Sequence, residues 1–451
     1  MLSLPISRAI LRWNTYAARS PLRRLGHAAL VAAATSLLAK VLGFAKQVVV
    51  AAVFGLSGAL DIYLVAFVLI GMPLSILLNA VQTALITHLS SGLDADAAAS
   101  RFSATSLLTL AVLAVLLPIW LWALPYVLPW LASGFSPDKR QALETALFWL
   151  IPYYFLNGLN LLGYGALQAK GRFLANGLLP AATPVAIMLA VLVWGSSGGW
   201  QVLAVALVAG SAIETLLLLV ALLRIGLLST RIHPIHNGIG QIIKVSLALL
   251  PGTFILALGP LVEQSIAAAM GEGSNAALAY GYKLPAALQG ILGTAIGITA
   301  LPYFSAQIGQ GNHAYSLHSL NKIAGWLLAG GALLALPLGV FSSEIAALLY
   351  QRGAFDAAAT GRVAPIQFAY FMQIPFVLMV WLGVKVMAAL NLNGLLSLYT
   401  ALGVLLQALL AYALAARYGL PGIAWAAVIV SALLAIASYL TARRSLRHLS
   451  R

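Results

Sequence analysis

Long apolar runs, each about the length of a membrane-spanning helix, dominate the pattern along this chain. A helix of about 20 apolar residues crosses the hydrocarbon core of a bilayer. The runs are rich in Leu, Ala and Val and lack the strict alternation of a transmembrane β-barrel. Polar, Gly/Pro or charged breaks separate twelve predicted spans, at 28–54, 59–90, 102–131, 141–169, 173–194, 200–223, 243–270, 276–308, 318–342, 362–390, 394–416 and 419–441.

The composition agrees with an all-α polytopic membrane protein. Hydrophobic residues make up 62% of the 451 residues and charged residues only 8%, whereas soluble domains carry about 25% charged residues. A water-soluble globule and a disordered chain are therefore both excluded. The sequence contains no cysteine, which excludes disulfides, thiolate metal sites and cysteine nucleophiles.

The net charge of +15 is distributed unevenly along the chain. With the N-terminus placed inside, sixteen Lys and Arg residues fall in cytoplasmic segments, five in outer loops and four within spans. Cytoplasmic loops of membrane proteins are enriched in Lys and Arg. The pattern predicts that both termini are cytoplasmic, and it explains most of the charge without a nucleic-acid partner.

The two halves of the chain resemble each other weakly. Span 2 ends in ALITHLS (84–90) and span 8 in ITALPYFS (298–305), while span 4 carries IPYYFLNG (151–158) and span 10 FAYFMQIP (368–375). Each matched pair is six spans apart, which indicates two six-helix lobes in a parallel repeat. We expect a basic cytoplasmic N-terminal segment at 1–27, followed by the first six-helix lobe at 28–224. A cytoplasmic linker at 225–242 then leads to the second lobe at 243–441, and a basic cytoplasmic tail follows at 442–451.

Lysines within the spans are the strongest candidates for function. A charge at bilayer depth costs at least about 2.5–3.5 kcal/mol, so it usually faces a partner or a wet cavity. Lys40 and Lys46 lie in span 1 and Lys283 in span 8, so the two lobes together could hold an anionic pyrophosphate. The alternative is that the ammonium groups extend to the membrane interface, which is favoured for Lys385 near the end of span 10.

Three acids in or near spans have alternative interpretations. Glu263 and Glu214 could couple transport to Na⁺ or H⁺, or could be structural partners or protonated acids. Asp61, at the start of span 2, could face the substrate or cap a helix N-terminus. The sequence contains no Walker loop and no His-Glu-x-x-His motif, so we expect no catalytic residue, no metal ligand and no bound cofactor.

Glycines and prolines interrupt several spans and are candidate hinges for alternating access. The candidates are Gly71, Pro73, Pro251, Gly252 and Pro285, with static kinks as the alternative at each site.

The opening of the chain resembles the MurJ/MviN lipid II flippases of the multidrug/oligosaccharidyl-lipid/polysaccharide exporter superfamily. The resemblance rests on AKVLGFAKQVVVAAVFG (39–55) followed by ALDIYLVAF (59–67). Further matches, in chain order, are QAKGRF (168–173), YKLP (282–285), GILGTAIG (290–297), LPYFS (301–305) and YQRGAFD (350–356). The matches are collinear from about residue 30 to 440, although flippases of this family usually have fourteen spans.

The resemblance implies two six-helix lobes around a central cavity in the bacterial inner membrane. It also implies outward movement of an undecaprenyl-pyrophosphate-linked glycan precursor, and therefore roles in peptidoglycan synthesis and cell shape. The cavity arginines of the family correspond to Lys40, Lys46 and Lys283, and its aspartate after the glycine turn corresponds to Asp61. The partners expected are the lipid-linked glycan, membrane lipids and glycan-synthesis proteins.

Two other functions are compatible with the sequence. One is a cation-coupled exporter of drugs or small solutes, although carboxylates rather than lysines would be expected in its cavity. The other is a membrane scaffold for glycan synthesis that transports nothing, which would tolerate loss of Lys40 and Lys283.

Overall fold

The computed structural model describes residues 21–90, 94–228 and 239–450, and all secondary-structure elements among them are helices. Most of the N-terminal segment 1–27 and most of the linker 225–242 therefore lie outside the described residues. The helices of the first half are α2 (Pro21–Phe54), α3 (Gly58–Leu89), α4 (Ala95–Leu131), α5 (Pro137–Trp149), α6 (Ile151–Ala169), α7 (Phe173–Leu178), the 3₁₀ turn η1 (Leu179–Ala181) and α8 (Ala182–Arg224).

The helices of the second half are α9 (Ile239–Ala268), α10 (Ser274–Gly309), α11 (His313–Val340), α12 (Ser342–Tyr350), α13 (Ala357–Met372), α14 (Ile374–Ala389), α15 (Asn393–Tyr418) and α16 (Leu420–Leu449). The basic tail predicted at 442–451 continues α16 as far as Leu449. Eleven helical segments of the described chain are long and apolar enough to cross a membrane, with α8 counted as two because its backbone is broken at Gly199 and with α13 and α14 counted as one. The pair α5 and α6, bent by 47°, makes a twelfth and corresponds to the predicted span 141–169.

Polar side chains at the breaks in the sequence begin the helices. Ser57, Asp94, Ser136 and Asp356 each accept a hydrogen bond from the backbone N–H three residues later, at the start of α3, α4, α5 and α13. These caps satisfy N–H groups that a helix leaves unpaired at its first turn. The helices that cross the apolar layer therefore begin at defined residues.

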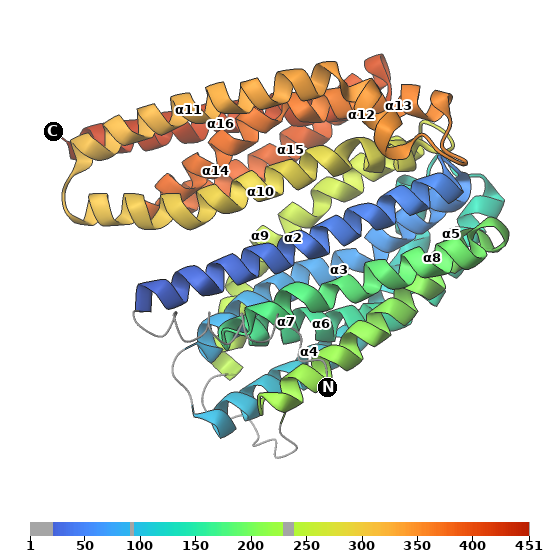
Figure 1. The fold of residues 1–451 in the computed structure, drawn as a ribbon, viewed down its shortest axis with the longest axis horizontal. Helices are drawn as coiled ribbons and strands as arrows, with labels where there is room; N and C mark the ends of the chain where they lie inside the picture. The colour runs from blue at the N-terminus through green and yellow to red at the C-terminus, as the bar shows by residue number, and fades with distance from the viewer. Residues whose placement is uncertain (1–20, 91–93, 229–238, 451) are drawn as a thin grey trace, which may run out of the picture.

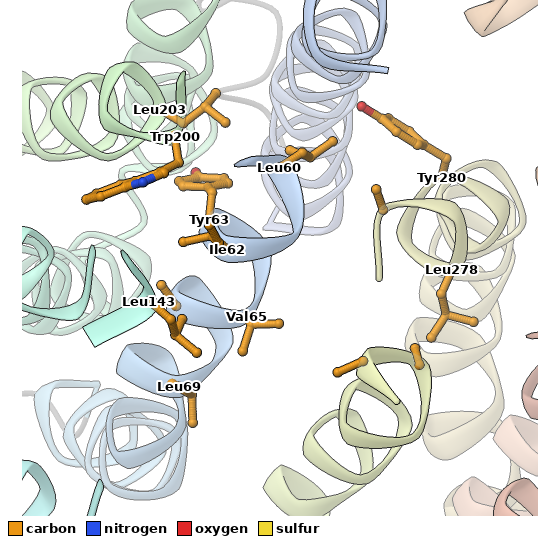
Figure 2. Packing of buried hydrophobic residues seen from close by; sticks show 14 of the residues in the cluster. Leu60, Ile62, Tyr63, Val65, Leu69, Leu143, Trp200, Leu203, Leu278 and Tyr280 are labelled. Carbon is orange, nitrogen blue, oxygen red and sulfur yellow. The ribbon is translucent and has the colours of Figure 1, made fainter. Parts of the chain in front are cut away.

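The helices form two lobes that pack together at one end and diverge toward the other (Figure 1). The largest cluster of buried apolar residues contains side chains from both lobes, and Figure 2 shows Leu60 and Tyr63 of α3 in this cluster with Leu278 and Tyr280 of α10. Smaller clusters in the other half of the molecule belong mainly to a single lobe, including one around Phe102. We call the shared end the closed end and the opposite end, where α10 meets α11, the open end.

Helix α9 lies between the two lobes rather than wholly in the second one. It packs most extensively against α3 of the first lobe and also against α15 of the second. The Thr253 hydroxyl donates a hydrogen bond to the carbonyl oxygen of Ile76 in α3, with an O–O distance of 2.7 Å. The predicted boundary at 243 thus falls within a helix that connects the lobes.

Candidate functional site

A cavity of about 730 Å³ lies between the lobes. Its lining comes from α2, α3, α6 and α8 on one side and from α9, α10, α13 and α16 on the other. Both apolar and polar side chains line it, including Tyr63, Phe67, Asn157 and Asn275. Cavities of 300–1,000 Å³ are typical of small-molecule sites, so this one can take a headgroup of that size.

Lys46 of α2 and Lys283 of α10 both line this cavity, one from each lobe. They lie about 12 and 14 Å along their helices from the closed end, at 1.5 Å per residue. Among the described residues neither forms an ion pair or hydrogen bond, and their charges repel each other. Two facing cations that pair directly with no carboxylate give the cavity wall two positions that can bind an anion.

Lys40 lies farther toward the open end and is outside the cavity lining. A methyl group built on Gly290 of α10 would lie 3.7 Å from the Lys40 Nζ. Lys40 thus lies between the lobes, farther from the closed end than Lys46 on the same helix.

Two carboxylates, Glu263 of α9 and Glu214 of α8, line the cavity with the lysines. The Gln407 amide donates to Glu263 Oε1 at 3.0 Å. Glu214 accepts hydrogen bonds from the hydroxyls of Tyr164, at 2.5 Å, and of Thr183. The described residues contain no cluster of three or more His, Asp or Glu side chains that would hold a metal ion.

Asp61 is fully buried at the closed end and does not line the cavity. Its carboxylate accepts hydrogen bonds from the backbone N–H groups of Gly273 at 2.7 Å and Ala276 at 3.0 Å, at the start of α10. It also pairs with the Lys139 ammonium of α5 at 3.2 Å. Asp61 therefore caps a helix, but the helix belongs to the opposite lobe, and Ser57 caps its own.

A reciprocal contact lies beside Asp61. Glu272 Oε1 accepts a hydrogen bond from the Gly58 N–H at the start of α3, at 2.7 Å. The Arg362 guanidinium of α13 donates to the Glu272 carbonyl at 3.1 Å and to the Ser274 hydroxyl at 3.3 Å. Each lobe thus supplies an acid to the first turn of the other lobe's helix. We call Asp61, Lys139, Glu272 and Arg362 the latch.

Glycines bring the two backbones into direct contact next to the latch. Ala354, in the loop before α13, donates its N–H to the Ala52 carbonyl of α2 at 2.7 Å. Gly353 has a φ of +59°, and a methyl group built on it would overlap the Ala52 carbonyl oxygen. A side chain at this position would push the lobes apart, so glycine is required there.

Replacing Gly353 with alanine should lower the free energy of unfolding by about 1–3 kcal/mol, because the left-handed backbone and the overlap both oppose a Cβ. Thermal unfolding in detergent would measure the change. The matched control is Gly361→Ala, since that glycine lies within α13 with open space around it. Equal unfolding temperatures for the two variants would show that the backbone contact is unimportant.

The candidate hinges lie within continuous helices. Gly71 and Pro73 are inside α3, Pro251 and Gly252 inside α9, and Pro285 inside α10. A methyl group built on Gly71 or Gly252 would meet no neighbouring atom within 4 Å. The structure gives one conformation, so bending at these positions stays a prediction.

The sequence alone does not reveal the partners in the latch. Lys139 and Arg362 are two of the five basic residues that the predicted topology places in outer loops, and Glu272 lies in the predicted loop between spans 7 and 8. A signal was present, because Glu272 precedes span 8 much as Asp61 begins the related span 2. Acids at the starts of two repeat-related helices indicate a symmetric contact between them.

Comparison with known proteins identifies the family. The model of the family described as lipid II flippase MurJ matches residues 50–451. A probable lipid II flippase MurJ of Synechocystis is 27% identical over 425 residues, covering 90% of this chain and 79% of the relative. The lipid II flippase MurJ of Burkholderia cenocepacia is 25% identical over 362 residues, covering 75% of this chain and 68% of the relative.

Solved structures share the fold. A lipid II flippase MurJ in an inward closed conformation has a TM-score of 0.73 at 17% identity, covering 93% of this chain and 91% of that one. An inward-facing multidrug resistance transporter of the MATE family has a TM-score of 0.74 at 15% identity, and the match covers 93% of this chain and 98% of that one. Since the family model spans most of the sequence, the chain belongs to the lipid II flippase MurJ family.

Proposed function

We propose that this protein is a flippase for an undecaprenyl-pyrophosphate-linked glycan precursor, lipid II or a close relative, in the bacterial inner membrane. The observation that carries the proposal is the pair of unpartnered lysines, Lys46 and Lys283, facing one cavity from opposite lobes. The family supplies the substrate class, because its members are named for lipid II. A diphosphate is the part of such a lipid that two ammonium groups would hold.

The open end faces the cytoplasm in this proposal. Most of the Lys and Arg residues of the described chain that lie near helix ends are at the open end, among them Arg101, Lys170, Arg172, Arg224, Lys244, Lys322, Arg443, Arg444 and Arg447. Lys139, Arg140, Arg352, Arg362 and Arg417 lie at the closed end. The enrichment of cytoplasmic segments in basic residues supports this orientation, with both termini inside.

Alternating access requires the latch to open while the open end closes. The headgroup would enter between the diverging ends of the lobes and bind Lys46 and Lys283, with its lipid tail remaining in the bilayer. Separation of Asp61 from α10 and of Glu272 from α3 would then expose the cavity to the outside. Asp61, named as a substrate ligand from the resemblance, would act in this scheme by holding the lobes together.

Reconstitution in liposomes tests the proposal. Vesicles with and without the protein would receive fluorescent undecaprenyl-pyrophosphate-linked disaccharide in one leaflet, and its arrival in the other leaflet would be followed. The proposal predicts faster transfer in protein-containing vesicles. Equal rates would reject it and would be expected of both the scaffold and a drug exporter.

Glu263 is the better candidate for ion coupling. One amide donor reaches its carboxylate, whereas Glu214 already accepts two hydroxyl hydrogen bonds. Glu263 therefore has more acceptor positions left for Na⁺ or a proton. Replacing Glu263 with glutamine should leave slow transfer that no longer responds to a Na⁺ or H⁺ gradient.

Rates measured with and without each gradient test this, with Glu214→Gln as the matched control that keeps its response. A Glu263→Gln protein that still responds to the gradient would overturn the assignment of coupling to this residue.

A drug exporter of the same superfamily is the alternative. Glu214 and Glu263 are the observation in its favour, since both line the cavity and could attract a cation. Such a protein would accumulate cationic dyes in vesicles and would leave the labelled lipid in its original leaflet.

A further inference from the structure

One face of α10 carries a regular series of positions between the lobes. Lys283, Gly290 and Gly297 are spaced seven residues apart. Seven residues make nearly two helical turns, so these positions differ by only about 20° per step and rise by about 10 Å. They therefore form a line from the cavity toward the open end.

A lysine from another helix lies over each glycine of this line. A methyl group built on Gly290 would be 3.7 Å from Lys40 Nζ, and one on Gly297 would be 3.6 Å from Lys385 Cε. Lys40 belongs to α2 of the first lobe and Lys385 to α14 of the second. The absence of side chains at the two glycines leaves room for both lysines against α10.

A tryptophan packs against α10 one helical turn before Lys385. Trp381 lies one helical turn before it on α14, and a methyl group built on Gly293 of α10 would be 3.0 Å from the Trp381 ring. The indole thus sets the approach of α14 to α10. The stem of Lys385 lies beside Gly297 of α10, and extension of its ammonium to the membrane interface, which the sequence favoured, stays a prediction.

Among the described residues, Lys283, Lys40 and Lys385 form no ion pair or hydrogen bond. Glu263 and Glu214 line the cavity near Lys283, and the acids of the open end, Asp94 and Asp96, belong to the loop before α4 and the start of that helix. Three lysines that form no ion pair thus lie beside α10 positions about 10 Å apart, and they form a positive path from the open end to the cavity.

We propose that Lys385, Lys40 and Lys283 form a loading path that receives the diphosphate of the substrate at Lys385 and passes it along α10 to the cavity. This inference rests on the proposed function and adds a first binding position, at Lys385, to it. The chemistry recognised is a diphosphate monoester or diester on a lipid chain. Lysine suits stepwise transfer, because its ammonium is a mobile point charge rather than a rigid bidentate fork.

The first test is the concentration dependence of transfer in the liposome assay. Lys385→Gln should raise the half-saturating substrate concentration about tenfold, as loss of one charge-assisted contact would, and should leave the maximal rate nearly unchanged. Lys385→Arg should keep wild-type behaviour. Lys322→Gln is the matched control, since Lys322 is an exposed lysine near the same end on α11.

The second test does not depend on transport. In purified protein carrying Lys46→Gln and Lys283→Gln, residual binding of farnesyl pyrophosphate would be measured by calorimetry, with farnesol as the uncharged control. The path predicts that adding Lys385→Gln removes this residual binding and that adding Lys322→Gln does not.

The outcomes separate the two proposals. If Lys385→Gln behaves like Lys322→Gln in both tests, the loading path is overturned. Lipid transfer by the wild-type protein would still support the proposed flippase function in that case. Binding that depends on Lys385 in a protein that transfers no lipid would support the path as an anion site and reject the flippase.

Discussion

Replacing Lys46 and Lys283 together with glutamine should reduce lipid transfer by about a hundredfold or more, because each lysine supplies a charge-assisted contact of about 1.5–3 kcal/mol to the diphosphate. The same double variant should be as stable as the wild type or more stable. The two ammonium groups have no partner among the described residues and repel each other, so their removal relieves an unfavourable interaction. Transfer in liposomes and thermal unfolding in detergent measure the two effects.

The opposite signs of these effects distinguish a binding role from a structural one. A structural role would lower both transfer and stability in the double variant. The matched control is Lys46→Arg with Lys283→Arg, which keeps both charges and should retain substantial transfer. Wild-type transfer by the glutamine variant would reject the cavity as the headgroup site.

Replacing Asp61 with alanine should lower the free energy of unfolding by about 3–5 kcal/mol, as expected when one partner of a buried ion pair is removed. The change leaves the Lys139 ammonium without its carboxylate and the N–H groups of Gly273 and Ala276 without an acceptor. Protein that remains folded should open more readily at the closed end. Denaturant unfolding measures the first effect, and labelling of a cavity cysteine from the outer side measures the second.

The control for Asp61 is Asp138→Ala. Asp138 is an exposed acid in the first turn of α5, one residue before Lys139, so its loss should change stability little. Similar unfolding curves for the two variants would contradict the latch. If Asp61→Ala lowers stability but does not increase labelling of the cavity cysteine from the outer side, Asp61 stabilises the fold as a helix cap and does not control opening of the closed end.

The membrane-length helices were predictable because they follow from local composition, whereas the two lobes were inferred from the matches six spans apart. Apolar runs of membrane length correspond to the observed spans, and even the bent pair α5 and α6 corresponds to one predicted span. Lys46 and Lys283 could be assigned to one cavity because an unpaired charge in a span needs a polar space, and two lobes share one such space.

Contacts that depend on the relative placement of distant helices could not be predicted. Lys139 is 78 residues from Asp61, and Gly273 is 212 residues from it. The sequence identified a capping acid but gave no information about which helix it caps. The glycine face of α10 beside the Lys385 side chain is likewise visible only in the assembled structure, and extension of this lysine to the membrane interface stays a prediction.

The cysteine-free chain allows a direct measurement of headgroup binding in the cavity. A single cysteine at the cavity residue Asn157 would be labelled with a water-soluble maleimide, and one at the exposed residue Asn393 serves as control. The account predicts that undecaprenyl pyrophosphate slows labelling at position 157 only, that undecaprenol does not, and that Lys46→Gln with Lys283→Gln abolishes the protection. Equal labelling rates at position 157 with and without the pyrophosphate would contradict a diphosphate site between the lobes.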